Sequence, residues 1–178
     1  MSTLKVPVSL GDHTRGDPSA RVTMVEYGDY ECPYCGLVHP VVEALRKAFP
    51  GDIRFVFRHF PLTQVHRNAE VAAEAAEFAG AHLRFWEMHD AIYENQDRLG
   101  LPLLLTLAAA LSLSDAELQD DLAEGVYRQK VRSDFAGGVR SGVNGTPTFF
   151  INGLRHDGSY DFSALAEAIA NAPIRPAV

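Results

Sequence analysis

The sequence predicts an α/β domain, in which a central mixed β-sheet is flanked by helices and interrupted by an all-helical insertion. A strand, an amphipathic helix and a second strand follow one another within residues 21–60. Alanine-rich helical segments then continue to about residue 143, before a short strand, a turn and a last helix. We therefore expect three segments: 1–62 and 144–178 as the two parts of one sheet-bearing domain, and 63–143 as the helical insertion.

The first unit reads as strand, helix, strand. Residues 21–27 are rich in branched and aromatic side chains and stop at Gly28, as a central strand does. The following helix begins at the cysteines, carries apolar residues at helical spacing and ends at Pro50-Gly51. Pro40 lies inside this helix and should bend its axis. Residues 53–60 alternate and predict a second strand, parallel to the first across the helix.

The helical stretch begins near residue 65 and breaks near residues 80, 100–102 and 113–114. Ser114 and Glu117 have the spacing of a capping box, which predicts a helix start at that point.

The C-terminal part reads as a hairpin and a helix. Residues 148–151 predict a third strand, Asn152-Gly153 is a strong two-residue turn, and residues 154–156 predict the return strand. A last helix is expected from about residue 162 to 171, with Asp161 as its cap.

Length, charge and hydropathy favour one soluble domain. The chain has 178 residues, 47% of them hydrophobic, and a formal net charge of -7. Its basic residues form no block that would bind phosphates, so we expect no nucleic-acid partner. Residues 1–10 lack the apolar core of a signal peptide, and no later run is long enough to span a membrane. We therefore expect a cytoplasmic protein without membrane contact.

The only two cysteines, Cys32 and Cys35, are separated by just two residues and cannot staple a fold. At the start of a helix, unpaired N–H groups and the helix dipole favour a thiolate at Cys32, the candidate nucleophile. Cys35, one turn further in, is placed to resolve a mixed disulfide. A metal half-site is the alternative, and His39 could add a third ligand. Because no second clustered pair exists, we expect no metal. Since the cysteine pair itself can store the electrons, we expect no other cofactor.

Three runs together resemble the DsbA-like branch of the thioredoxin superfamily. They are Val-Glu-Tyr at 25–27 ahead of Cys-Pro-Tyr-Cys at 32–35, Phe-Trp-Glu-Met-His-Asp at 85–90, and Gly-Thr-Pro-Thr-Phe-Phe-Ile-Asn-Gly at 145–153. The resemblance covers nearly the whole chain. It implies a thioredoxin fold with an inserted helical subdomain, and thiol-disulfide exchange through a redox-active disulfide between the two cysteines.

The resemblance also implies roles for the surrounding residues. Pro147 would follow a cis peptide bond and pack against the disulfide. The backbone of Thr146 would bind an extended substrate, with Pro33 and Tyr34 as further substrate-binding residues. Glu26 would be the buried acid that relays protons to the resolving cysteine, although the phase of its strand leaves a solvent-facing position open.

The sequence departs from the family's strong oxidants, which carry histidine where this chain has Tyr34. We therefore expect a redox potential between those of thioredoxin and the strong oxidant.

The expected reaction is dithiol-disulfide exchange with protein disulfide or dithiol substrates, recycled by glutathione or a thioredoxin-type system. In a reducing cytoplasm, reductase or isomerase work is favoured. Two alternatives stay open. One is a glutathione-using enzyme of the same fold, which normally lacks the second cysteine. The other is a metal-binding or chaperone-like module.

Overall fold

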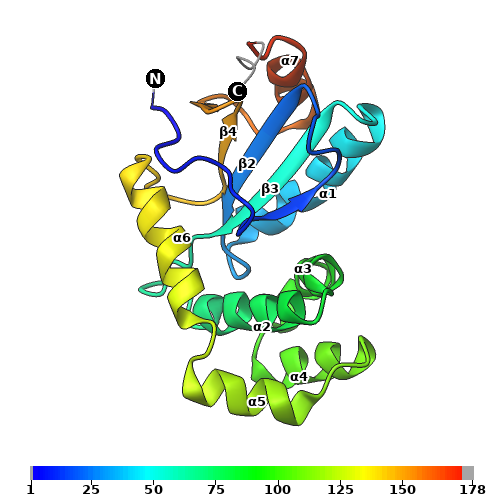
Figure 1. Ribbon diagram of the computed structural model, residues 1–178, viewed down its shortest axis with the longest axis vertical. Helices are drawn as coiled ribbons and strands as arrows, with labels where there is room; N and C mark the ends of the chain where they lie inside the picture. The colour runs from blue at the N-terminus through cyan, green and yellow to red at the C-terminus, as the bar shows by residue number, and fades with distance from the viewer. Residues whose placement is uncertain (1, 174–178) are drawn as a thin grey trace.

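The computed structural model describes residues 2–173. The outer ends of the two predicted sheet segments, residue 1 and residues 174–178, lie outside the described residues. One five-stranded mixed sheet has the order β1-β3-β2-β4-β5 (Figure 1). Its central pair, β2 and β3, is parallel, and the other neighbouring pairs are antiparallel. This sheet and its flanking helices confirm the predicted fold class. The strands are β1 (His13–Arg15), β2 (Val22–Gly28), β3 (Ile53–His59), β4 (Thr148–Ile151) and β5 (Leu154–Arg155).

The sequence did not predict β1, which pairs antiparallel with β3 at the edge of the sheet. The strand has only three residues, His13, Thr14 and Arg15, none of them apolar. A short polar edge strand carries no alternating pattern that could reveal it, and such edges protect a sheet from pairing with other chains.

The helices between β3 and β4 are separate short elements. The predicted caps are confirmed, since the Ser114 hydroxyl accepts from the Glu117 N–H at 3.1 Å and the Asp161 carboxylate accepts from the Ala164 N–H at 2.9 Å. A further break at Gly125, whose φ of 68° ends α5, was not predicted. The helices are α1 (Pro33–Ala48), α2 (Ala69–Ala81), α3 (Phe85–Glu94), the 3-10 turn η1 (Gln96–Arg98), α4 (Leu101–Ala110), α5 (Asp115–Glu124), α6 (Arg128–Arg140) and α7 (Phe162–Ala170). Among them, α1 runs through Pro40 without interruption. Within residues 2–173 no helix has the length and apolarity needed to cross a membrane.

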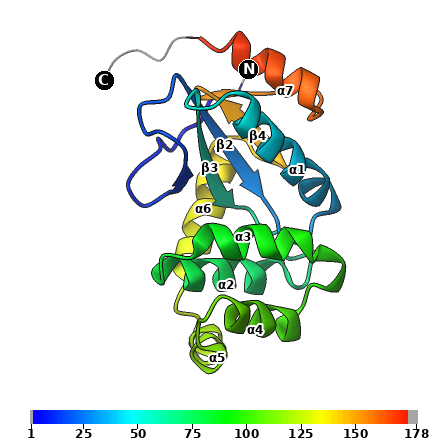
Figure 2. The same ribbon diagram turned by 90° about the vertical axis from the view of Figure 1, so that its right-hand side faces the viewer.

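Two apolar clusters cover the two faces of the sheet. In β2, Val22 and Met24 pack with α1, α7 and the inserted helices, whereas Val25 and Tyr27 pack into a smaller cluster that includes Phe150. Figures 1 and 2 show α1 and α7 on one face, α6 on the other, and α2 to α5 gathered at one end of the sheet. This alternation decides which side chains of β2 can reach the start of α1.

Helix α6 lies directly on the sheet, although it falls within the predicted helical insertion. A Cβ added at Gly138 would meet the ring of Phe60 at 2.6 Å and that of Tyr27 at 3.0 Å. Only a glycine permits so close an approach of helix and sheet. The insertion is therefore anchored to the sheet through α6 as well as through its connections.

The chain's only tryptophan, Trp86, joins α3 to the edge strand. Its Nε1 donates to the carbonyl of Thr14 at 3.2 Å, and the guanidinium of Arg15 lies 4.6 Å from its ring centroid. The Trp86 ring also packs against Phe55 of β3, with ring centroids 5.7 Å apart.

Candidate active site

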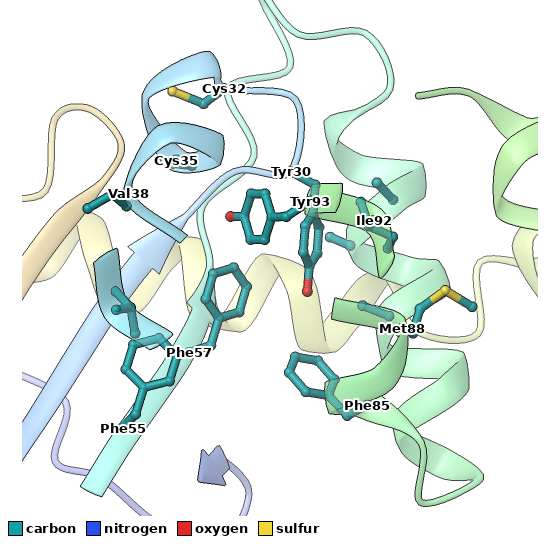
Figure 3. Packing of buried hydrophobic residues seen from close by; sticks show 14 of the residues in the cluster. Tyr30, Cys32, Cys35, Val38, Phe55, Phe57, Phe85, Met88, Ile92 and Tyr93 are labelled. Carbon is teal, nitrogen blue, oxygen red and sulfur yellow. The ribbon is translucent and has the colours of Figure 1, made fainter. Parts of the chain in front are cut away.

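Cys32 is the N-cap residue of α1 and Pro33 opens the helix. Both cysteines are free thiols and buried, with exposed fractions of 4% for Cys32 and 0% for Cys35. Figure 3 shows the sulfur of Cys32 at the top of the first turn and Cys35 one turn further in. One thiol therefore lies just beneath the surface, and the second lies behind it.

The two thiols differ strongly in acidity. The pKa of Cys32 is lowered to about 5, chiefly by the hydrogen bond from Cys35, against the opposing effect of burial. The Thr146 side chain and the backbone N–H groups of Tyr34 and Cys35 lower it further. Burial raises the pKa of Cys35 well above its usual value, only partly offset by the Asp29 N–H, which lies 3.5 Å from its sulfur. Near neutral pH the site therefore holds a Cys32 thiolate and a protonated Cys35.

The loop before β4 closes the site from the side. The Thr146–Pro147 peptide bond is cis, and Sγ of Cys32 lies 3.3 Å from the Thr146 carbonyl, to which it donates when protonated. Backbone and side chain of Thr146 thus both lie at the reactive sulfur.

Glu26 lies on the face of β2 that carries the cysteines. It is two residues from Met24, which packs in the same cluster as Cys35, and side chains two apart share a face of a strand. Its sheet neighbours are Phe57 of β3 and Phe149 of β4. Burial raises its pKa to about 8, and the nearby Cys32 charge adds to the increase. The ambiguity of strand phase is therefore resolved toward the buried position.

Pro33 and Tyr34 form the outer surface of the same turn. Both are exposed, and Tyr34 keeps 70% of its surface open to solvent. Because they follow Cys32 directly in the chain and are open to solvent, they are available to a molecule that approaches Cys32.

The loop from Asp29 to Cys32 is tied down by residues that the sequence analysis missed. The buried Asp29 carboxylate accepts from the Glu31 N–H, the Leu62 N–H and His66 Nδ1, each at 2.8 Å. An acid placed between a strand end and a helix start was the signal available for Asp29.

A second set of anchors comes from the helical insertion. The Tyr30 hydroxyl bonds Nδ1 of His89 at 2.9 Å, and the Asn68 N–H and side-chain amide donate to the Glu31 carboxylate at 2.6 and 2.8 Å. Gln96 reaches the same loop from η1. Nothing local in the sequence marks these contacts, because each joins segments at least 37 residues apart.

Two groups of ligand-type side chains lie close together in the described part of the chain, and neither contains a cysteine: His39 with His89 and Asp90, and His59 with Glu77 and Asp134. The carboxylates of both groups are already paired. Arg15 binds Asp90 at 2.7 Å, His59 binds Glu77 at 2.7 Å and Lys130 binds Asp134 at 2.7 Å. His39, weighed above as a partner of the cysteines, faces α3 instead.

A mixed sheet with two cysteines at the start of its first long helix, and with helices inserted ahead of the strand that follows Pro147, is a thioredoxin-like fold with a helical insertion. The chain itself belongs to the thioredoxin family, whose model, described as Thioredoxin, matches residues 9–171.

Solved structures with this fold superpose over nearly the full chain. Oxidised BdbD from Bacillus subtilis has a TM-score of 0.86 at 24% identity and covers 95% of this chain and 96% of its own. The alpha-DsbA1 protein of Wolbachia pipientis has a TM-score of 0.82 at 23% identity, covering 95% and 94%. A thioredoxin-like oxidoreductase from Silicibacter pomeroyi reaches a TM-score of 0.78 at 27% identity, covering 91% and 92%. The shared fold includes the helical insertion.

Curated relatives with higher identity are much longer proteins. A protein of Salinispora arenicola named Na(+)/H(+) antiporter NhaA 1 is 48% identical over 170 residues, which are 95% of this chain and 26% of that protein. One from Nitrosospira multiformis, named Na(+)/H(+) antiporter NhaA, is 39% identical over 163 residues, 89% of this chain and 25% of that protein. The chain thus spans about a quarter of the length of these relatives.

Proposed function

We propose that this chain exchanges disulfides between its Cys-Pro-Tyr-Cys site and protein or small-thiol substrates. One observation carries the proposal: a Cys32 sulfur with a pKa of about 5 lies beside the Thr146 carbonyl, with the protonated Cys35 directly behind it. A nucleophile, a resolving thiol and a stretch of backbone for binding thus meet at one point.

The exchange needs no electron carrier beyond the two cysteines. The Cys32 thiolate attacks one sulfur of a substrate disulfide, whose S–S bond breaks, and the first substrate sulfur leaves as a thiolate. Cys35 then loses its proton and attacks the sulfur of Cys32, which expels the second substrate thiolate. Two electrons pass from the chain to the substrate, and the chain keeps a Cys32–Cys35 disulfide. The same steps in reverse oxidise a substrate dithiol.

Glu26 supplies the proton transfer at Cys35 in this scheme. Its pKa of about 8 depends partly on the negative charge of the Cys32 thiolate. In the mixed disulfide that charge is gone, so the carboxyl ionises more readily at the step at which Cys35 must give up a proton. In the reverse direction the protonated carboxyl returns a proton to Cys35 as it leaves.

An extended substrate segment would pair with the backbone at Thr146, next to the reactive sulfur. Main-chain pairing of this kind tolerates many sequences, and the exposed ring of Tyr34 offers an apolar contact beside it. Protein disulfides in flexible or partly unfolded segments are the substrates that fit this arrangement best.

We propose a cytoplasmic setting and a reductase or isomerase direction, with glutathione or a thioredoxin-type system as the recycling partner. Both cysteines belong to the redox pair and neither staples the fold, as is usual in a reducing compartment. The proposal concerns this chain alone, which spans about a quarter of its antiporter-named relatives.

The deciding experiment is the turbidity assay of insulin reduction by dithiothreitol, with wild type and Cys32→Ser compared. We expect the wild type to shorten the lag before precipitation and Cys32→Ser to match the uncatalysed rate. A wild type with both thiols free and no effect on the lag would overturn the proposal.

A further inference from the structure

Gln96 joins the helical insertion to the reactive turn. Its Nε2 donates to the carbonyl of Tyr30 at 2.8 Å and to the carbonyl of Cys32 at 2.9 Å. These two carbonyls flank the peptide units that deliver Cys32 to the start of α1. A single side chain, 64 residues beyond the nucleophile, therefore holds both ends of that segment.

An amide suits this position. The carboxamide nitrogen of Gln96 has two N–H groups, and the two carbonyl acceptors satisfy both of them. The Cys32 carbonyl also accepts the Gly36 N–H at 3.2 Å, the first hydrogen bond of α1. Gln96 thus supports the same carbonyl that anchors the first turn, whose N–H groups stabilise the thiolate.

The facing helix has a matching feature. A Cβ added at Gly36 would lie 2.2 Å from Oε1 of Gln96, closer than any real contact. Gly36 therefore leaves room for Gln96 against the first turn of α1. A glycine inside a helix costs stability, roughly 0.5 to 1 kcal/mol relative to alanine, and the contact with Gln96 gives a reason for its presence.

We infer that Gln96 is a positioning residue of the thiol site, which holds the Tyr30 and Cys32 carbonyls so that the sulfur of Cys32 stays over the N–H groups of the first turn of α1. The inference rests on the proposed function, because it assigns Gln96 a part in making Cys32 a nucleophile. Without the two donors, the Tyr30 carbonyl loses this partner and the Cys32 carbonyl keeps only the Gly36 N–H. Both carbonyls can then tilt their negative ends toward the sulfur, and the thiolate loses stabilisation.

The other groups that act on Cys32 are separate from Gln96. Cys35 lies on the same helix, Glu26 comes from β2, and Thr146 comes from the loop before β4. The Glu31 carboxylate, next to Cys32 in the chain, is bound by Asn68 at the start of α2. Replacing Gln96 by an uncharged residue leaves all of these in place, so a change at Cys32 can be assigned to the lost donors.

The test measures the acidity of Cys32 in the reduced chain, by thiolate absorbance at 240 nm and by the alkylation rate with iodoacetamide against pH. The variant is Gln96→Met, which keeps the length and removes both donors. The matched control is Gln119→Met on the exposed side of α5. We expect the pKa of Cys32 to rise by about 1 unit in Gln96→Met, equivalent to about tenfold in the ionisation constant. Alkylation at pH 5 should then slow by about fivefold and match wild type at pH 8.

A second variant acts from the other side of the contact. Gly36→Ala should displace Gln96 while favouring the helix, and so raise the pKa of Cys32 in the same direction without loss of α1. If both variants keep the wild-type pKa within about 0.3 units, or slow alkylation equally at every pH, the inference is wrong. Alkylation needs no disulfide substrate, so this result is independent of the insulin assay. An active wild type with unchanged acidity in the variants refutes the role of Gln96 alone.

Discussion

Replacing Glu26 by glutamine should make the protein more stable and less active. Burial holds the pKa of Glu26 at about 8 instead of 4.5. The unfolded chain ionises this carboxyl above pH 4.5, whereas the folded chain keeps it protonated until about pH 8. The folded state therefore binds more protons between these limits, and stability falls as the pH rises through that window.

The size of the effect follows from the same interval. At 1.36 kcal/mol per pKa unit, the difference between the unfolded and folded pKa of Glu26 corresponds to about 5 kcal/mol in the free energy of unfolding. About 3 kcal/mol of this stability is already lost at pH 7. Glutamine has nearly the same shape and no charge, so Glu26→Gln removes this dependence. Burying the amide between Phe57 and Phe149 can cost stability, but that cost does not depend on pH. The informative quantity is therefore the slope of the stability difference against pH.

The measurement is denaturation by guanidinium chloride at several values from pH 5 to 8, in a Cys32→Ser background so that Cys32 does not titrate. Loss of the Cys32 charge brings the upper limit of the window somewhat below 8. The stability of Glu26→Gln relative to its parent should grow by about 1.4 kcal/mol per pH unit across the window. Glu167→Gln, at an exposed position on α7, is the matched control and should show a nearly constant difference. Parallel curves for Glu26→Gln and its parent would refute a buried, protonated Glu26.

Two further predictions concern the thiols and the loop before them. Cys35→Ser should accumulate a mixed disulfide between Cys32 and substrate, because the resolving attack is lost; non-reducing electrophoresis with a disulfide peptide would detect it, and free Cys32 after incubation would count against the assignment. Asp29→Asn should lower the free energy of unfolding by about 2 to 4 kcal/mol. The Asp29 carboxylate accepts three hydrogen bonds inside the protein, and the NH2 group of asparagine would face one of these N–H donors instead of accepting from it. Urea denaturation would measure this loss, and a change below about 0.5 kcal/mol would contradict it.

Local signals were enough to predict the elements that carry strong patterns. The strand before the cysteines, the amphipathic helix after them and the caps at Ser114 and Asp161 depend on neighbouring residues, and the structure has them. The edge strand β1 and the helix break at Gly125 were not predicted. A three-residue polar strand has no hydrophobic period, and a single glycine can lie inside a helix as well as at its end.

The candidate site divides in the same way. Cys32 and Cys35 were found from their spacing and position, and Pro147 and Thr146 from a run that resembles a known family. Glu26 could be suspected but not oriented, since the face of a strand depends on what packs against it. Gln96 could not be found at all, because its partners lie in a different segment and only the fold brings them together.

The position of the single tryptophan has a practical consequence. All indole fluorescence of this protein originates where α3 meets β1, with Trp86 bonded to Thr14 and covered by Arg15. Release of the sheet edge would expose the indole to water and shift its emission to longer wavelength while the helices remain intact. Emission and far-ultraviolet circular dichroism, recorded along one denaturation curve, would therefore separate local loosening at this junction from cooperative loss of the whole fold.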